Sequence, residues 1–218
     1  MPRVRITVGV HPHNARLYTE ELEAQLRSLL ADPRVGSLGE IGLDYHYDLS
    51  PRDVQREVFR RQIRLAKEAG LPTSLHIREA HDEALEILND EGFPEAGTLL
   101  HCCSLGPDEI KPWIDAGCYI AFGGALTFKN AEAAREGAKL VPLDRILTET
   151  DAPYMAPVPL RGVTCEPNEV AFTVAKLAEV RGETGLAKIA SMQRAISENA
   201  DALLNRAPTP WQEENAAK

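Results

Sequence analysis

The sequence predicts an α/β protein in which a parallel β-sheet is covered by helices. Short, β-rich apolar segments alternate with amphipathic helical segments along the chain, a pattern typical of successive β/α units. Polar side chains and one glycine stand where these strands end, about one β/α unit apart: His11, Glu40, His76, His101, Gly123 and Asp151. Because the carboxyl ends of the strands in a β/α barrel converge on one face, the sequence predicts a barrel with a single site at that face.

Local signals mark where the helices begin and end. Thr19 is placed to cap a helix whose first turn carries Glu20 and Glu21, which suit the positive end of the helix dipole. Pro51 suits the first position of a long helix that Gly70 ends. Strands are predicted at residues 5–10, around Glu40, and at 72–77, 97–100, 118–122 and 145–149, with the later helices at 80–89, 107–116, 130–140, 166–181 and 186–204.

Length and composition set the domain organisation. With 218 residues and 44% hydrophobic content, the chain can bury a sizeable core. It contains no sequence repeat and no long linker. We therefore expect a single barrel-like domain over residues 1–206 and a flexible polar tail over residues 207–218.

Charge and cysteine content narrow the class of protein. A net charge of −9 argues against a non-specific nucleic-acid coat protein, although bound divalent cations can invert the local charge and keep phosphate chemistry open. The four cysteines form neither a CxxC pair nor a secreted framework, so we expect reduced thiols and a cytoplasmic protein. Neither a signal peptide nor a membrane-length apolar run is found, so no membrane partner is expected.

The segment GEIGLDY, residues 39–45, places a carboxylate where the backbone is nearly bare. Apolar residues lead into Glu40, which has Gly39 before it and Gly42 shortly after it. A surface strand would alternate polar and apolar residues, so this segment suits a strand that ends at a site. Taken alone, it leaves three roles open for Glu40: buried hydrogen-bond acceptor, metal ligand, or acid–base group.

The strand ends together supply an oxygen and nitrogen ligand set: Glu40, His76, His101 and Asp151. A single buried His or Glu is usually a core residue with a satisfied hydrogen bond, whereas four at one rim favour a metal site. Such ligands suit Mg, Mn, Zn or Fe, as one or two ions that activate water. Glu40 and Asp151 are the candidate catalytic residues. Glu40 is able to bridge two ions, and Asp151 is able to take the proton from the attacking water.

Three further residues are candidates for binding the substrate. His11 and His13, in an HPH tripeptide after the first strand, face the substrate, support the metal ligands or shape a turn. Arg78 either pairs with a substrate anion or forms a surface salt bridge. The sequence alone does not decide between these alternatives.

The motifs resemble those of the TatD-type metal-dependent deoxyribonucleases. The matching segments are GVHPH (9–13), GEIGLDY (39–45), PTSLHIREA (72–80), LHCCSLG (100–106), FGGALTFK (122–129), LTETDAPYMAPVPLRG (147–162) and CEPNEV (165–170). The resemblance implies a TIM-type β/α barrel of the metal-dependent hydrolase kind that cleaves DNA, single-stranded or damaged, with Mg, Mn or Zn. It also implies that the family's metal ligands correspond to Glu40, His76, His101 and Asp151.

The chain departs from the family pattern at its start. Family members open with a strand bearing an HxH pair of metal ligands and one more β/α unit, whereas here Met1 precedes what would be the third strand. We therefore expect an incomplete barrel with about six of eight strands, from a misassigned start or a shortened member. Open edges expose strand hydrogen bonds, which predicts lower stability or closure by an oligomeric partner.

Three functions follow from these patterns. The first is a metal-dependent hydrolase that cleaves phosphodiester bonds of DNA. The second is a barrel amidohydrolase or lactonase acting on a small substrate, because the same ligands polarise carbonyl groups. The third is a truncated, non-catalytic remnant that binds metal. The missing HxH pair supports this third function.

Overall fold

The computed structural model describes residues 4–216, which fall into two compact units. The first unit comprises the chain up to Leu99 and from Asp201 onward, and the second runs from Leu100 to Ala200. The boundary falls inside strand β4 (Thr98–Leu100). The first unit contains β1 (Ile6–Val8), β2 (Val35–Asp44), β3 (Thr73–Arg78), α1 (Glu20–Leu30), α2 (Arg52–Ala69), α3 (His81–Glu91) and α8 (Pro210–Asn215). The second contains β5 (Tyr119–Phe122), β6 (Ile146–Thr148), α4 (Pro107–Asp115), α5 (Glu132–Leu140), α6 (Val170–Val180) and most of α7 (Leu186–Leu204).

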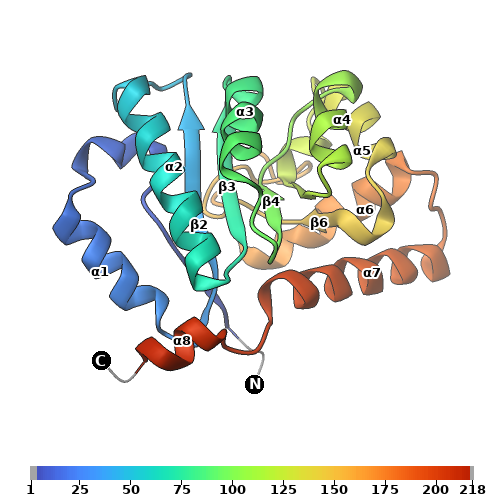
Figure 1. The fold of residues 1–218 in the computed structure, drawn as a ribbon. Helices are drawn as coiled ribbons and strands as arrows, with labels where there is room; N and C mark the ends of the chain where they lie inside the picture. The colour runs from blue at the N-terminus through green and yellow to red at the C-terminus, as the bar shows by residue number, and fades with distance from the viewer. Residues whose placement is uncertain (1–3, 217–218) are drawn as a thin grey trace. The chain divides into compact units, whose positions relative to one another are not determined.

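The strands pair in parallel within each unit, which confirms the predicted α/β class. In the first unit β1 pairs with β2 and β2 with β3, and Gly42 stands opposite His76. In the second unit β5 pairs with β6, with Ile120 opposite Ile146. The described residues contain the six strands that the sequence predicts, in the predicted places. Helix α2 runs alongside β2 (Figure 1) and, as predicted, ends at Gly70, which adopts the left-handed conformation (φ 65°).

Each unit has its own apolar core. In the first, Leu38, Ile41 and Leu43 of β2 are fully buried with Phe59 and Ile63 of α2. In the second, fully buried side chains come from α4, β5, β6 and α6: Trp113, Ile120, Phe122, Ile146 and Leu177. Burying each such aliphatic or aromatic side chain stabilises the fold by about 1.5–3 kcal/mol.

Two buried glutamines of α2 hold the ends of neighbouring strands. The side-chain oxygen of Gln62 accepts the amide of Val10 at 2.7 Å, and its nitrogen donates to the carbonyl of Val10 at 3.0 Å. Gln55 makes the same two-way contact with the backbone of Asp44, at 2.8 Å and 3.2 Å. Because each glutamine both accepts and donates, it fixes the backbone that leads directly into His11 or the end of β2.

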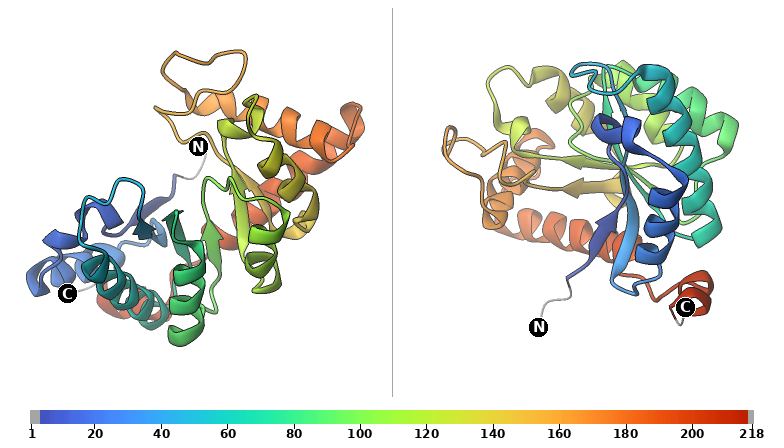
Figure 2. Two further views of the ribbon diagram at one scale, coloured as in Figure 1. Left: turned by 90° about the horizontal axis from the view of Figure 1, so that it is seen from above. Right: turned by 90° about the vertical axis from the view of Figure 1, so that its left-hand side faces the viewer.

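The C-terminal residues differ from the flexible tail predicted for 207–218. Pro210–Asn215 form α8, capped by the Thr209 hydroxyl, which accepts the amide of Gln212 at 3.1 Å. The buried side chain of Gln212 donates to the carbonyls of Leu30, Asp32 and Val35 at 3.0–3.2 Å. Figures 1 and 2 show α8, in red, beside the amino end of β2. The single-domain organisation of residues 1–206 stays a prediction.

Replacing Gln212 by alanine is expected to lower the free energy of unfolding by about 1–3 kcal/mol, because buried carbonyls lose their donor. Urea denaturation followed by circular dichroism measures this change. The exposed neighbour Glu214→Ala is the matched control and should stay within about 0.5 kcal/mol of the parent chain. Equal stability of both variants would contradict the docking of α8.

Candidate metal centre

In the first unit β2, β3 and the segment that follows β1 bring four predicted site residues together. Glu40 lies inside β2 and His76 inside β3, not at the ends of these strands as the sequence predicts. Nε2 of His11 and Nδ1 of His76 lie 3.8 Å and 3.9 Å from Oε2 of Glu40. The ring of His11 lies 4.3 Å, centroid to centroid, from the rings of both His13 and His76. The predicted ligands Glu40 and His76 therefore share one cluster with the predicted substrate-binding His11 and His13.

A β-bulge sets the direction of Glu40. Gly39 pairs with Ser74 and Ile41 with Leu75, so Glu40 is the extra residue between two consecutive pairs of the ladder. Its side chain is 38% exposed although the rest of β2 is buried. Gly39 is required beside it, because a Cβ there would stand 2.6 Å from Cβ of Ser74. The bulge thus turns one carboxylate of a buried strand outward.

Behind the cluster lies Asp44, whose side chain is fully buried. Its Oδ2 accepts Nε2 of His13 at 2.8 Å and Nε2 of His76 at 2.9 Å, and its Oδ1 accepts the amides of His46 and Tyr47 at 3.0 Å and 2.8 Å. Burial raises the pKa of Asp44, but the hydrogen bonds from Tyr47, His76 and His13 outweigh burial and lower the pKa to about 2. Asp44 is therefore a carboxylate at neutral pH and only accepts hydrogen bonds.

These contacts fix where the ring protons of two histidines lie. The amide of His13 donates to Nδ1 of His11 at 3.2 Å, so the neutral ring of His11 carries its proton on Nε2, toward Glu40. His76 donates from Nε2 to Asp44, so its Nδ1 presents a lone pair toward Glu40. Nitrogens of His11, His13 and His76 all lie within 4.8 Å of one another. The proton positions make Nε2 of His11 a hydrogen-bond donor and leave Nδ1 of His76 able to bind a metal ion.

The Glu40–His76 pair fits a divalent ion. Metal–nitrogen and metal–oxygen bonds of about 2.0–2.2 Å limit two ligand atoms of one ion to a separation of about 4.3 Å. Nδ1 of His76 and Oε2 of Glu40 lie 3.9 Å apart. An unprotonated imidazole nitrogen beside a carboxylate is a donor set that Zn, Mn and Fe accept.

In the second unit, His101, Glu149 and Asp151 follow the ends of β4 and β6. Nδ1 of His101 lies 3.3 Å from the buried Oε1 atom of Glu149, a half-buried residue that the sequence did not single out. Burial raises the pKa of Asp151, His101 lowers it and Glu149 raises it, which leaves that pKa above its ordinary value. The end of β5 adjoins this group, since a Cβ on Gly123 would stand 3.7 Å from Cγ of Glu149.

Two parts of the predicted site stay predictions. Glu40 and His76 belong to the first unit and His101 and Asp151 to the second, and the binding of one ion by all four stays a prediction. The guanidinium of Arg78 lies 4.8 Å from the ring centroid of Tyr47, a cation–π contact, and its contact with a substrate anion stays a prediction as well.

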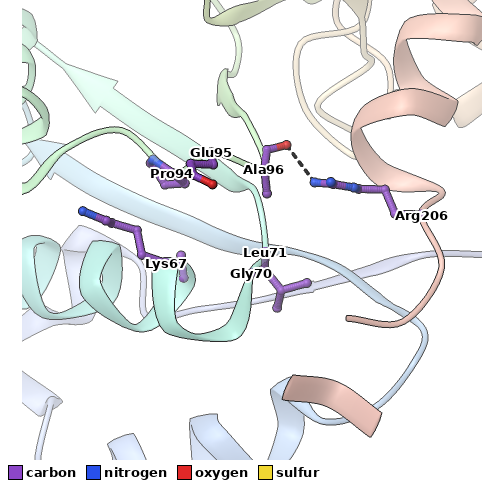
Figure 3. Close-up of a pocket in the computed structure, with 8 residues that line it drawn as sticks. Lys67, Gly70, Leu71, Pro94, Glu95, Ala96 and Arg206 are labelled. Atoms are coloured by element: carbon purple, nitrogen blue, oxygen red, sulfur yellow. Dashed lines mark hydrogen bonds between the residues drawn. The ribbon is translucent and has the colours of Figure 1, made fainter. Parts of the chain in front are cut away.

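A separate hollow of about 470 Å³ lies elsewhere in the first unit (Figure 3). It is lined by residues that end α2, precede β4 or follow α7, among them Lys67 and Arg206. Both cations already donate to backbone carbonyls, Lys67 to that of Glu91 and Arg206 to that of Ala96. These segments adjoin the amino ends of β3 and β4. In β/α folds the amino ends of the strands contribute to stability and the carboxyl ends to catalysis, so the hollow lies at the non-catalytic end.

Comparisons with known proteins show that the chain is similar to metal-dependent hydrolases. The family model described as TatD related DNase matches residues 1–205. The metal-dependent hydrolase YabD of Bacillus subtilis is 41% identical over 90% of this chain and 75% of its own length. The 3′-5′ ssDNA/RNA exonuclease TatD of Enterobacter lignolyticus is 36% identical over 81% of this chain and 70% of its own.

Solved structures give the same result. The crystal structure of the TatD homologue YJJV from Escherichia coli superposes with a TM-score of 0.83 at 27% identity, over 93% of this chain and 77% of that one. A TatD-family hydrolase from Entamoeba histolytica gives a TM-score of 0.81 at 20% identity, which speaks for the fold alone. The predicted fold class, a TIM-type β/α barrel of which six strands are present, is confirmed. The chain belongs to the TatD related DNase family of metal-dependent hydrolases.

Proposed function

We propose that the chain hydrolyses phosphodiester bonds of single-stranded DNA with a divalent metal ion. The observation that carries this proposal is the Glu40–His76 pair, in which a carboxylate oxygen and an unprotonated imidazole nitrogen on the neighbouring strands β2 and β3 lie 3.9 Å apart. The relative from Enterobacter lignolyticus, named as a single-stranded DNA and RNA exonuclease, supports the substrate class.

Each site residue has a proposed part in this reaction. Glu40, His76, His101 and Asp151 supply the metal ligands, as the sequence predicts. When bound, the ion activates water and offsets charge on the phosphate. His11 donates its Nε2 proton to a phosphate oxygen, and Asp151 accepts the proton of the attacking water. Arg78 pairs with a neighbouring phosphate, a role that its exposure supports.

The partners and compartment are also proposed. DNA is the substrate partner, and closure of the sheet edges by a second chain stays a prediction. The four cysteines are free thiols in the structure, which supports the cytoplasmic location expected from the sequence. None of the helices in residues 4–216 combines the length and apolar character that crossing a bilayer requires.

Cleavage is expected to depend on metal and on Asp151. A labelled single-stranded oligonucleotide is incubated with the chain in Mn²⁺ or Mg²⁺, then in excess EDTA, and products are resolved on a gel. EDTA should abolish cleavage and added Mn²⁺ restore it. Asp151→Asn, prepared identically, tests for contaminating nucleases, since asparagine tolerates the left-handed backbone of this position (φ 61°).

Three outcomes separate the candidate functions. Cleavage that is lost in Asp151→Asn supports the nuclease. Turnover of lactones or amides without DNA cleavage would replace it by the small-substrate hydrolase. Tight Mn²⁺ binding with no turnover of any substrate would leave the non-catalytic remnant.

A further inference from the structure

The most completely enclosed charged group of the first unit is the carboxylate of Asp44. It has no exposed surface, and its two oxygens accept four hydrogen bonds. Burying a carboxylate is costly unless donors surround it, and here each donor is positioned by the fold. Two donors are the amides of His46 and Tyr47, two and three residues past the end of β2, and the other two are imidazole nitrogens.

The division of donors between the oxygens fixes the side chain's orientation. Oδ1 faces only backbone amides, and Oδ2 faces only Nε2 of His13 and Nε2 of His76. An acceptor with no proton obliges both rings to donate from Nε2. The proton of neutral His76 is thereby held away from Nδ1, the nitrogen that lies 3.9 Å from Glu40.

We propose that Asp44 is a positioning residue that selects Nδ1 of His76 as its metal-binding atom and holds His13 in the same network. The inference rests on the proposed function only in taking His76 as a metal ligand. Asp44 does not meet the ion or the substrate, because its carboxylate is enclosed behind the two rings. It acts through the tautomer and the orientation of His76.

The register of the sheet explains why this residue reaches both rings. Gly42 pairs with His76, and Asp44 follows two residues later on the same face of β2. Gly42 has no side chain, so none stands between Asp44 and the ring of His76. His13 comes from the segment after β1, which Ser50 fixes by donating its hydroxyl to the carbonyl of His13 at 2.9 Å.

Asp44→Asn is the sharpest test, because it replaces a carboxylate oxygen by an NH2 group and keeps the size and shape of the side chain. The two backbone amides demand an oxygen on their side, so the new amide nitrogen must face the rings and donate to them. Nε2 of His76 would then accept, and the ring proton would move to Nδ1. The Kd for Mn²⁺, measured by isothermal titration calorimetry, should rise about 10–100-fold.

A matched control is Asp48→Asn, since Asp48 lies nearby and pairs with Arg52 at the surface. It should bind Mn²⁺ as the parent chain does. If Asp44→Asn folds and binds Mn²⁺ with unchanged affinity, the proposal is overturned. These readouts need no cleavage of DNA, so a chain that proves inactive as a nuclease leaves the test intact.

Nitrogen-15 NMR of the parent chain keeps the proposal testable if Asp44→Asn fails to fold. In the metal-free chain the proton of His76 should be on Nε2, with the signal assigned by its loss in His76→Gln. A proton on Nδ1 of His76 would overturn the proposal. In a folded Asp44→Asn chain, the proton should be found on Nδ1 instead.

Discussion

Glu40→Gln is expected to lower kcat/KM for cleavage of single-stranded DNA by at least about 100-fold, because loss of a residue that only orients a metal ligand already costs about 10–100-fold. Glutamine keeps the size of the side chain and one oxygen but removes the charge that attracts the ion. The 38% exposure of Glu40 and its place at a bulge make a folding defect small. Initial rates with a labelled oligonucleotide in Mn²⁺ measure the effect.

Glu57→Gln is the control for Glu40→Gln. Glu57 is an exposed residue of α2, so the same chemical change there should leave both the rate and the Mn²⁺ affinity unaltered. Cleavage by Glu40→Gln at the rate of the parent chain would remove Glu40 from the site. Loss of cleavage with unaltered metal affinity would instead assign Glu40 to the substrate rather than to the ion.

Gly42→Ala is expected to destabilise the fold by more than about 4 kcal/mol, a large share of the 5–15 kcal/mol typical of a domain. A Cβ at Gly42 would stand 2.1 Å from the carbonyl oxygen of His76, which is backbone and cannot move aside without breaking the ladder between β2 and β3. The position also has φ 143°, a region that side chains rarely adopt. Urea or thermal unfolding, together with the soluble yield, measures the loss.

A second glycine separates the two causes. Gly117 has φ 76°, and no described atom lies within 4 Å of a Cβ placed there. Gly117→Ala should therefore cost only the backbone penalty, about 1–2 kcal/mol. Equal losses in the two variants would contradict the large cost expected from the close approach of Gly42 to His76.

The sequence predicted those parts of the fold that local signals encode. The cap at Thr19, the end of α2 at Gly70 and the order of the strands all depend on residues near one another in the chain, and the structure confirms them. The helical tail was missed because the partners of Gln212 lie on residues 30–35, far away in the sequence. The periodicity of apolar residues along the sequence does not predict such a contact.

The site was predicted in its residue types but not in its supporting network. Glu40 and Asp44 stand four positions apart, which strand alternation assigns to one face, so alternation alone cannot tell which carboxylate meets solvent and which is enclosed. The bulge at Glu40 and the ring of His76 beside Asp44 decide this, and both depend on pairing with β3. Glu149 escaped notice for a similar reason, since its contact with His101 joins the ends of β4 and β6.

The paired glutamines of α2 imply that the geometry of the site depends on a helix more than on the loops. Gln62 and Gln55 form hydrogen bonds with the backbone of Val10 and Asp44, so helix α2 sets the spacing between the segment that bears His11 and the strand end that bears Asp44. Loops of different length could be exchanged around this helix without moving these residues. An engineer seeking new substrates should therefore vary the loops and preserve Gln55 and Gln62.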